Sequence, residues 1–169
     1  IKSLSMAVYG LFDFVLDSQK DKYERKYDVE IKHSGLTRSG RTSGIKRLMT
    51  VNLLKRLESS VEAFRLTMLG MLDLNRAELK RLSYYNAGQM RPDAYATKKV
   101  FNYEMFDQDE DGSLNLVQTD KGKDIHIEYA DIDRLSWQKA MEHDVEILEH
   151  LLNELGKITP EYDLKLQTL

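Results

Sequence analysis

The feature that most constrains the fold is an apolar stripe in the segment 45–72. Its members are alternately three and four positions apart, as in a heptad repeat: Leu54, Leu57, Val61, Phe64, Met68 and Met71. A stripe of this kind occupies one side of an α-helix and needs a partner helix along its length. Ser43 is a suitable N-cap for it. The helical pattern either runs on or restarts at Asp73, and it ends near Asn86 and Gly88.

A second long stripe lies in the segment 130–158. It has the same spacing of three and four residues: Trp137, Met141, Val145, Leu148, Leu152 and Leu155. Asp131 or Asp133 is a suitable cap for its start, and Gly156 follows its end. Two long helices, packed antiparallel, are therefore predicted.

The segment 4–27 also has a helical pattern. Its apolar residues Leu4, Val8, Leu11 and Val15 are three or four positions apart. Alternating residues at 29–31 and 125–129 indicate two short strands, which are able to pair with each other. The 169 residues suit one domain. The predicted fold is all-α, an elongated antiparallel helical bundle with two long helices and irregular insertions, and it leaves room for one short β-hairpin.

Composition excludes several classes of function. The chain has no cysteine, which rules out disulfides, thiol nucleophiles and thiolate metal sites, and which agrees with a cytoplasmic location. No apolar run approaches the roughly 20 residues of a membrane span. The net charge of -3 does not favour binding of polyanions by the domain as a whole.

The stretch FDQDEDGSLNL, residues 106–116, resembles most of a calcium-binding EF-hand loop. Asp107, Asp109 and Asp111 occupy the first, third and fifth loop positions. The twelfth position needs a bidentate acid, and here it is Gln118. No helical pattern follows the loop. We therefore interpret 89–124 as an acidic irregular linker and predict no metal site.

Catalytic patterns are weak. His143 and His150 are seven residues apart, whereas a helical metal pair usually has a spacing of four. The segment 34–44, SGLTRSGRTSG, contains glycines but lacks the Gly-Lys-Ser/Thr end of a phosphate-binding loop. We interpret it as a basic flexible loop and predict no catalytic residue.

Charge is distributed unevenly. From Ile31 to Leu57 there is no acidic residue, and seven positive charges occur: Lys32, Arg38, Arg41, Lys46, Arg47, Lys55 and Arg56. A basic loop that leads into a basic helix is a plausible place for phosphate contacts. The alternative is that these residues form an ordinary solvated face or attract the acidic segment 104–111.

The residues 47–68, RLMTVNLLKRLESSVEAFRLTM, resemble a helical segment between the two RecA-like lobes of bacterial Swi/Snf-type helicase-like ATPases. The match at Lys55–Ser60 is the specific part. The segments 125–155 and 158–169 resemble the later helix of that insertion and the lead-in to the second lobe. The resemblance implies a helical insertion domain at 1–158, followed at 159–169 by the truncated start of a RecA-like lobe.

The resemblance implies a helical accessory domain of an ATP-dependent nucleic-acid translocase. Its expected partners are duplex DNA and the RecA-like lobes of the same chain. ATP and Mg²⁺ would bind in the parent protein, an ATP-dependent helicase, and this segment would have no cofactor and no ATPase activity of its own. The alternative is a non-enzymatic interaction module that pairs through the heptad stripe. The candidate nucleic-acid contacts are Lys46, Arg47, Lys55, Arg56, Ser59, Ser60, Arg38 and Arg41.

Overall fold

A computed structural model describes residues 3–27, 38–98 and 125–157. Its elements, in chain order, are η1 (Leu11–Phe14), α1 (Asp17–Tyr27), α2 (Arg38–Ser59), α3 (Val61–Asn86), β1 (Tyr95–Lys98), β2 (Ile125–Glu128), η3 (Tyr129–Asp131) and α4 (Arg134–Leu155). The fold is mostly helical with one small antiparallel sheet, as the sequence predicted. None of the described helices is long and apolar enough to cross a membrane.

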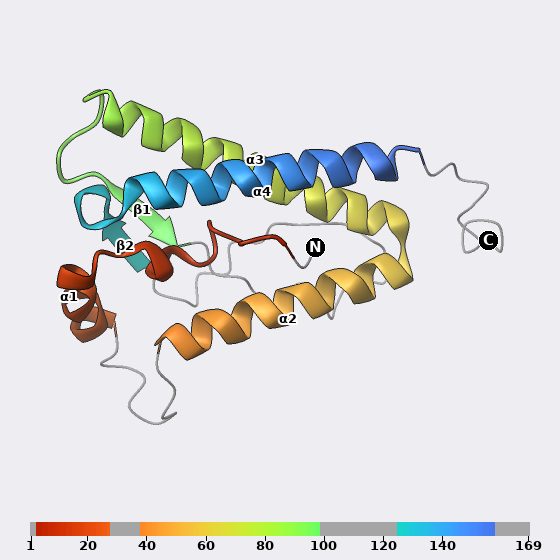
Figure 1. Cartoon of the computed structure of the whole chain (residues 1–169), viewed down its shortest axis with the longest axis horizontal. Coiled ribbons are helices and arrows are strands. Elements are labelled where there is room, and N and C mark those ends of the chain that lie inside the picture. Colours follow the sequence, from red (N-terminus) through yellow and green to blue (C-terminus); the bar gives the residue numbers. More distant parts are fainter. Residues whose placement is uncertain (1–2, 28–37, 99–124, 158–169) are drawn as a thin grey trace.

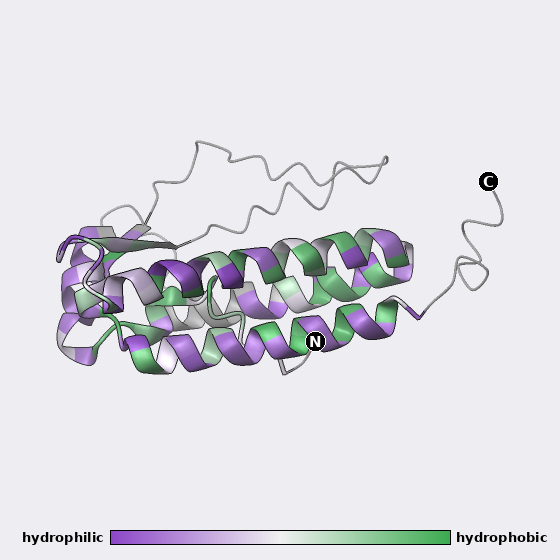
Figure 2. Ribbon diagram, turned by 90° about the horizontal axis from the view of Figure 1, so that it is seen from above, coloured by the Kyte–Doolittle hydropathy of each residue, from purple (hydrophilic) through white to green (hydrophobic). Residues whose placement is uncertain are grey.

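Three long helices lie roughly along one axis (Figure 1). α2 and α3 form a helical hairpin, and α4 runs antiparallel to α3 beside it. The small sheet and α1 lie at the end opposite the α2–α3 turn. Seen from above, hydrophilic and hydrophobic residues alternate along each helix (Figure 2), as expected for amphipathic helices that share a core.

The pairing of α3 with α4 follows the predicted stripes. Trp137, Met141 and Leu148 are buried on the side of α4 that packs against α3. Asp133 caps α4, because its carboxylate accepts a hydrogen bond of 3.1 Å from the Ser136 N–H. α3 ends at Asn86 and is followed by Gly88, whose φ of 69° favours glycine. These boundaries confirm the sequence prediction.

The first long helix is not continuous through 45–72. α2 ends at Ser59 and α3 begins at Val61, so the prediction of one uninterrupted helix was wrong. Ser60 between them is extended, and its hydroxyl caps α3 by accepting a 3.2 Å hydrogen bond from the Ala63 N–H. The chain reverses there, so the heptad stripe does not face one partner. Its later part, from Phe64 on, is buried, whereas Leu54 is 40% exposed.

The expected basic flexible loop at 34–44 is also corrected in part. Residues 38–44 are helical and form the first turns of α2, and Ser43 lies inside this helix rather than capping it. Residues 34–37 lie outside the described chain. Glycine disfavours a helix by about 1 kcal/mol. Burial of Met49 and Leu53 on the same helix offsets that cost, since packing of one face supplies most helical stability in proteins.

The segment 4–27 is helical only in its second half. α1 begins at Asp17, and residues 4–10 form an irregular segment that we call the strap. The apolar residues that suggested a helix, from Leu4 to Val15, are buried all the same. The strap lies against two helices, so it buries its apolar side chains without forming a helix of its own.

The short sheet pairs β2 with a different strand from the one that the sequence suggested. β2 pairs antiparallel with β1, in the register Tyr95↔Glu128 to Lys98↔Ile125. β1 therefore replaces part of the irregular linker predicted at 89–124. The segment 29–31, expected to pair with β2, lies outside the described residues, as do residues 99–124 with the acidic stretch.

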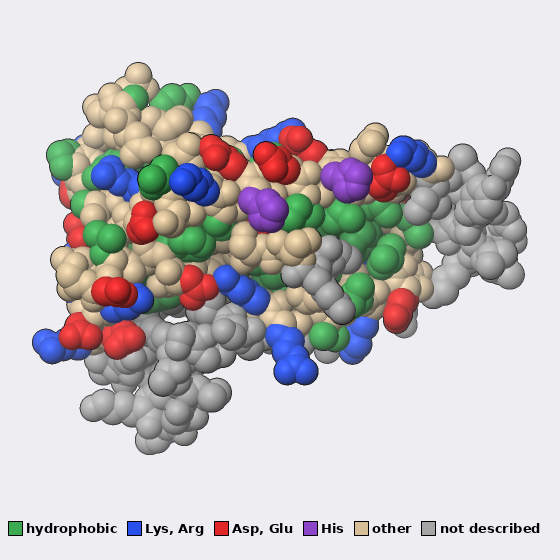
Figure 3. All heavy atoms as spheres, viewed as in Figure 1, with side chains coloured by type: hydrophobic (Ala, Val, Ile, Leu, Met, Phe, Trp, Pro, Cys, Tyr) green, Lys and Arg blue, Asp and Glu red, His purple; other side chains and the backbone are tan. Residues whose placement is uncertain are grey.

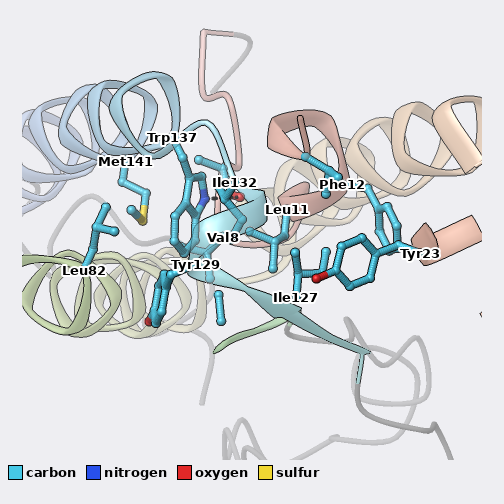
Figure 4. Close-up of a cluster of buried hydrophobic side chains, with 13 residues drawn as sticks. Val8, Leu11, Phe12, Tyr23, Leu82, Ile127, Tyr129, Ile132, Trp137 and Met141 are labelled. Carbon is cyan, nitrogen blue, oxygen red and sulfur yellow. Dashed lines mark hydrogen bonds between the residues drawn. The ribbon is translucent and has the colours of Figure 1, made fainter. Parts of the chain in front are cut away.

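Two apolar clusters stabilise the molecule. The first lies near the sheet, and Figure 4 shows Trp137 beside Tyr129 within it. The second lies between α2, α3 and α4, and includes Met49, Leu53, Phe64 and Leu148. The strap contributes to both clusters and therefore connects them.

Candidate nucleic-acid interface

α2 has a buried side and a solvent-exposed side. Met49 and Leu53 are fully buried on the inner side. The exposed side, which we call the outer face of α2, consists of five exposed residues that share one side of the helix: Arg47, Val51, Leu54, Lys55 and Glu58. Figure 3 shows basic and apolar side chains next to one another along this edge. The outer face is the part of the predicted interface that is available to a partner.

Arg47 and Lys55 are the two candidate basic residues that the structure places together on this face. They are eight positions apart, which corresponds to roughly 12 Å along the helix axis. Val51 and Leu54 lie between them and are 41% and 40% exposed. The outer face therefore combines two positive charges with exposed apolar surface.

Lys46 has a structural role. Its ammonium lies 2.7 Å from a carboxylate oxygen of Asp13 and forms an ion pair that connects α2 to η1. Its side chain also crosses Gly10 closely, since a Cβ at Gly10 would lie 2.6 Å from the Lys46 Cε. Lys46 is therefore not part of the outer face.

Arg56 and Ser60 act in the turn between α2 and α3. The Arg56 guanidinium donates a 3.3 Å hydrogen bond to the hydroxyl of Thr67 on α3. The Ser60 hydroxyl is occupied as the cap of α3. Ser59 is exposed at the C-terminal end of α2, where the helix dipole is negative and disfavours phosphate. Arg56 and Ser60 therefore contribute to the helical hairpin more directly than to a phosphate site.

Arg38 and Arg41 belong to the first turns of α2. Their side chains lie outside the described structure. The backbone places them on the same helix as Arg47 and Lys55, towards its N-terminus. The positive end of the helix dipole is at that terminus, which is the favourable end for an anion.

Sequence reasoning missed Asp144, a carboxylate that is 1% exposed on α4. It accepts hydrogen bonds from the strap, at 2.7 Å from the Ser5 N–H and 2.9 Å from the Ala7 N–H. A signal was available, because Asp144 is three residues after Met141 and four before Leu148. That spacing puts it on the buried side of α4, where a carboxylate needs partners.

A second missed network joins α1 to the segment after the sheet. The Lys22 ammonium lies 2.7 Å and the Tyr23 hydroxyl 2.6 Å from one oxygen of Asp131. Partial burial alone would raise the pKa of Asp131, but these two hydrogen bonds outweigh it and the net pKa is lowered. The network therefore holds a charged carboxylate at this junction.

The described residues offer little chemistry beyond these contacts. Within residues 3–27, 38–98 and 125–157, no three His, Asp or Glu side chains are arranged to hold a metal ion. A shallow hollow of about 400 Å³ is lined by residues that include Leu16, Asn86 and Leu135. No nucleophile lies beside a base among its lining residues.

Comparison with known proteins does not extend this description. No protein-family model, curated protein or solved structure matches the chain.

Proposed function

We propose that this chain is a helical accessory domain of a cytoplasmic Swi/Snf-type ATP-dependent nucleic-acid translocase, and that the outer face of α2 contacts duplex DNA. The observation that carries the DNA contact is the exposure of Arg47 and Lys55 on one side of α2. They belong to a segment, Ile31 to Leu57, that contains no acidic residue. The domain itself contributes no ATPase activity, and ATP and Mg²⁺ act in the RecA-like lobes of the parent protein.

The charge of the outer face favours a local phosphate contact. Lysine and arginine supply most contacts of proteins to the phosphate backbone. The net charge of the chain is -3, so attraction depends on this patch rather than on the whole domain. Glu58 lies at the end of the outer face towards the turn. The contact is therefore expected to centre on the part of α2 that precedes it.

The apolar part of the outer face supports coupling to the lobes. Val51 and Leu54 are large apolar side chains exposed between charged neighbours. Apolar residues surrounded by a charged rim are typical of surfaces that contact another protein. In this proposal, α2 contacts a RecA-like lobe through these residues while its basic residues reach DNA.

Charge reversal at both basic positions is expected to weaken DNA binding. The double variant Arg47→Glu/Lys55→Glu should bind a fluorescein-labelled duplex about tenfold more weakly or worse at about 50 mM salt, because two phosphate contacts are lost. The slope of log K against log salt should become shallower by about 1.8, since each phosphate contact contributes about 0.9. Fluorescence anisotropy across a salt series measures both quantities.

The single variant Lys55→Glu has as its matched control Lys139→Glu, which makes the same charge reversal at an exposed position on α4. The DNA affinity and the salt slope of Lys139→Glu should stay close to those of the unaltered protein. Equal loss in Lys139→Glu and Lys55→Glu would mean that binding follows net charge alone. Unchanged affinity in the double variant would contradict the proposed contact.

The second candidate is a protein-interaction module that uses the same face. The exposed Val51 and Leu54 favour it. If α2 pairs with a second copy, sedimentation should show a concentration-dependent dimer, and Leu54→Glu should abolish it. Leu135→Glu, at a position on α4 that is 63% exposed, is the control and should leave the dimer intact. A monomer at all concentrations would contradict self-association.

A further inference from the structure

The strap, residues 4–10, lies between α2 and α4 (Figure 1). Its side chains are as buried as those of the helices, with Ala7 and Val8 at 1% exposure or less. Met6 has a φ of 51°, in the left-handed region that non-glycine residues rarely adopt. A strained residue persists where the surrounding contacts hold it firmly. The strap is therefore an anchored part of the fold.

The anchor on α4 is polar and buried. Asp144 accepts three hydrogen bonds from the strap, from the Ser5 N–H at 2.7 Å, the Ser5 hydroxyl at 2.8 Å and the Ala7 N–H at 2.9 Å. About two turns before Asp144 on α4, the Trp137 Nε1–H donates a 3.1 Å hydrogen bond to the Ala7 carbonyl (Figure 4). Hydrogen bonds to a charged, buried acceptor are stronger than neutral ones.

The anchor on α2 is apolar and ionic. Leu4, Met6 and Tyr9 of the strap belong to the same apolar cluster as Met49 and Leu53 of α2. Just beyond the strap, the Lys46–Asp13 ion pair connects α2 to η1 at 2.7 Å. The side of the strap that does not meet α4 therefore holds α2.

Within the described chain, α2 contacts α3 and η1, and its direct contacts with α4 are few. α2 is thus attached to the rest of the molecule by the turn at Ser60, by its packing against α3, by its contacts with η1, and by the strap. If the strap leaves, the inner side of α2 loses its partners Leu4, Met6 and Tyr9.

We propose that the strap is a latch that links α2 to α4 and so keeps α2 packed against α3, with Asp144 as its principal anchor. Fixing α2 in this way fixes the orientation of the outer face. Release of the strap would free α2 to move about the turn at Ser60. The consequence for DNA contact rests on the proposed function, whereas the latch itself is a property of the fold.

The test is hydrogen–deuterium exchange of the whole chain carrying Asp144→Asn. The substitution keeps the size of the side chain but places an amide N–H against the donors of the strap. Backbone amides of residues 5–13 and 46–57 should exchange about tenfold faster than in the unaltered protein. Amides of 64–82 and 145–155 should change much less. Glu146→Gln, an exposed position on the same helix, makes the same charge change and should alter none of these rates.

Two results would overturn the latch. Faster exchange in 5–13 with unchanged exchange in 46–57 would mean that α2 does not depend on the strap. An equal increase in all segments would mean a general loss of stability. If Asp144→Asn does not fold, Ser5→Ala removes the hydrogen bonds from the Ser5 hydroxyl to Asp144 and to the Ala140 carbonyl, and it is judged by the same two segments. DNA affinity of the unaltered protein is measured separately, so absence of DNA binding would count against the proposed function and leave the latch standing.

Discussion

Replacing Trp137 with alanine is expected to lower the free energy of unfolding by about 3 to 5 kcal/mol, the usual cost of deleting a buried aromatic side chain. Trp137 is 1% exposed and lies beside Tyr129, with ring centroids 6.3 Å apart. The substitution also removes the hydrogen bond to the Ala7 carbonyl and leaves that buried acceptor without its donor. Urea unfolding followed by far-ultraviolet circular dichroism measures the change.

The matched control is Leu135→Ala, two residues earlier on α4 and 63% exposed. It should change the free energy of unfolding by about 0.5 kcal/mol or less. Trp137→Phe should fall between the two, since it keeps an aromatic ring but loses the N–H donor. Trp137 is the single tryptophan of the chain, so its fluorescence reports the first apolar cluster in every variant that retains it. A loss below about 1 kcal/mol in Trp137→Ala would contradict this account of the core.

Raising the pH above 10 is expected to unfold the protein. Burial raises the pKa of Tyr9, Tyr23 and Tyr129 from 10.0 to about 12 in each case. In the unfolded chain these hydroxyls ionise near pH 10, so the folded state binds more protons between pH 10 and 12. The stability that the neutral tyrosines contribute is complete below pH 10 and is lost as the pH rises to 12. Loss of this contribution from three tyrosines favours unfolding in that pH window, because the net stability of a domain is only about 5 to 15 kcal/mol.

Circular dichroism and phenolate absorbance, recorded on the same samples against pH, measure this transition. Ionisation of the buried tyrosines should coincide with loss of helix. Tyr129→Phe is the most informative variant, because the Tyr129 hydroxyl is buried and has no hydrogen-bond partner among the described residues. It should move the alkaline midpoint upward. Tyr84→Phe, at a position that is 43% exposed, is the control and should not. Retention of helix at pH 12 with ionised tyrosines would contradict the prediction.

The sequence predicted α4 well, because local signals and tertiary contacts agree there. The stripe that begins at Trp137 faces α3, the cap at Asp133 forms, and the helix ends at Gly156. The end of α3 at Asn86 was predicted for the same reason. Where one face of a helix is buried and its ends carry capping residues, periodicity is a sufficient guide.

The prediction of one long helix was wrong because its heptad spacing continues across a point where the chain reverses. Leu57 and Val61 keep the heptad spacing in the sequence. Ser60 between them is extended, however, and caps a new helix. The helix predicted from Leu4 to Val15 was wrong for a different reason. Their spacing suits a helix, yet these residues are buried in the strap and η1 between two helices. The spacing of apolar residues indicates that one side of a segment is buried. It does not identify the backbone conformation, because an irregular segment can bury the same residues as a helix.

The exposure of the candidate contact residues could be predicted only in part. Seven basic residues were visible in the sequence, but which of them face solvent depends on contacts far along the chain. Lys46 is held by Asp13, and Arg56 by Thr67. The sequence contains no local signal for either pairing, so it could not separate Arg47 and Lys55 from their neighbours.

The anchor between Ser5 and Asp144 also has a consequence for biosynthesis. The two residues are 139 positions apart. A ribosome adds about 5 to 20 residues per second. Asp144 is therefore synthesised roughly 7 to 28 s after Ser5. During that time Leu4, Met6 and Val8 have no α4 to cover them and are available to chaperones or to neighbouring nascent chains. Growth temperature and elongation speed should therefore affect the soluble yield of this protein more strongly than its final stability would suggest.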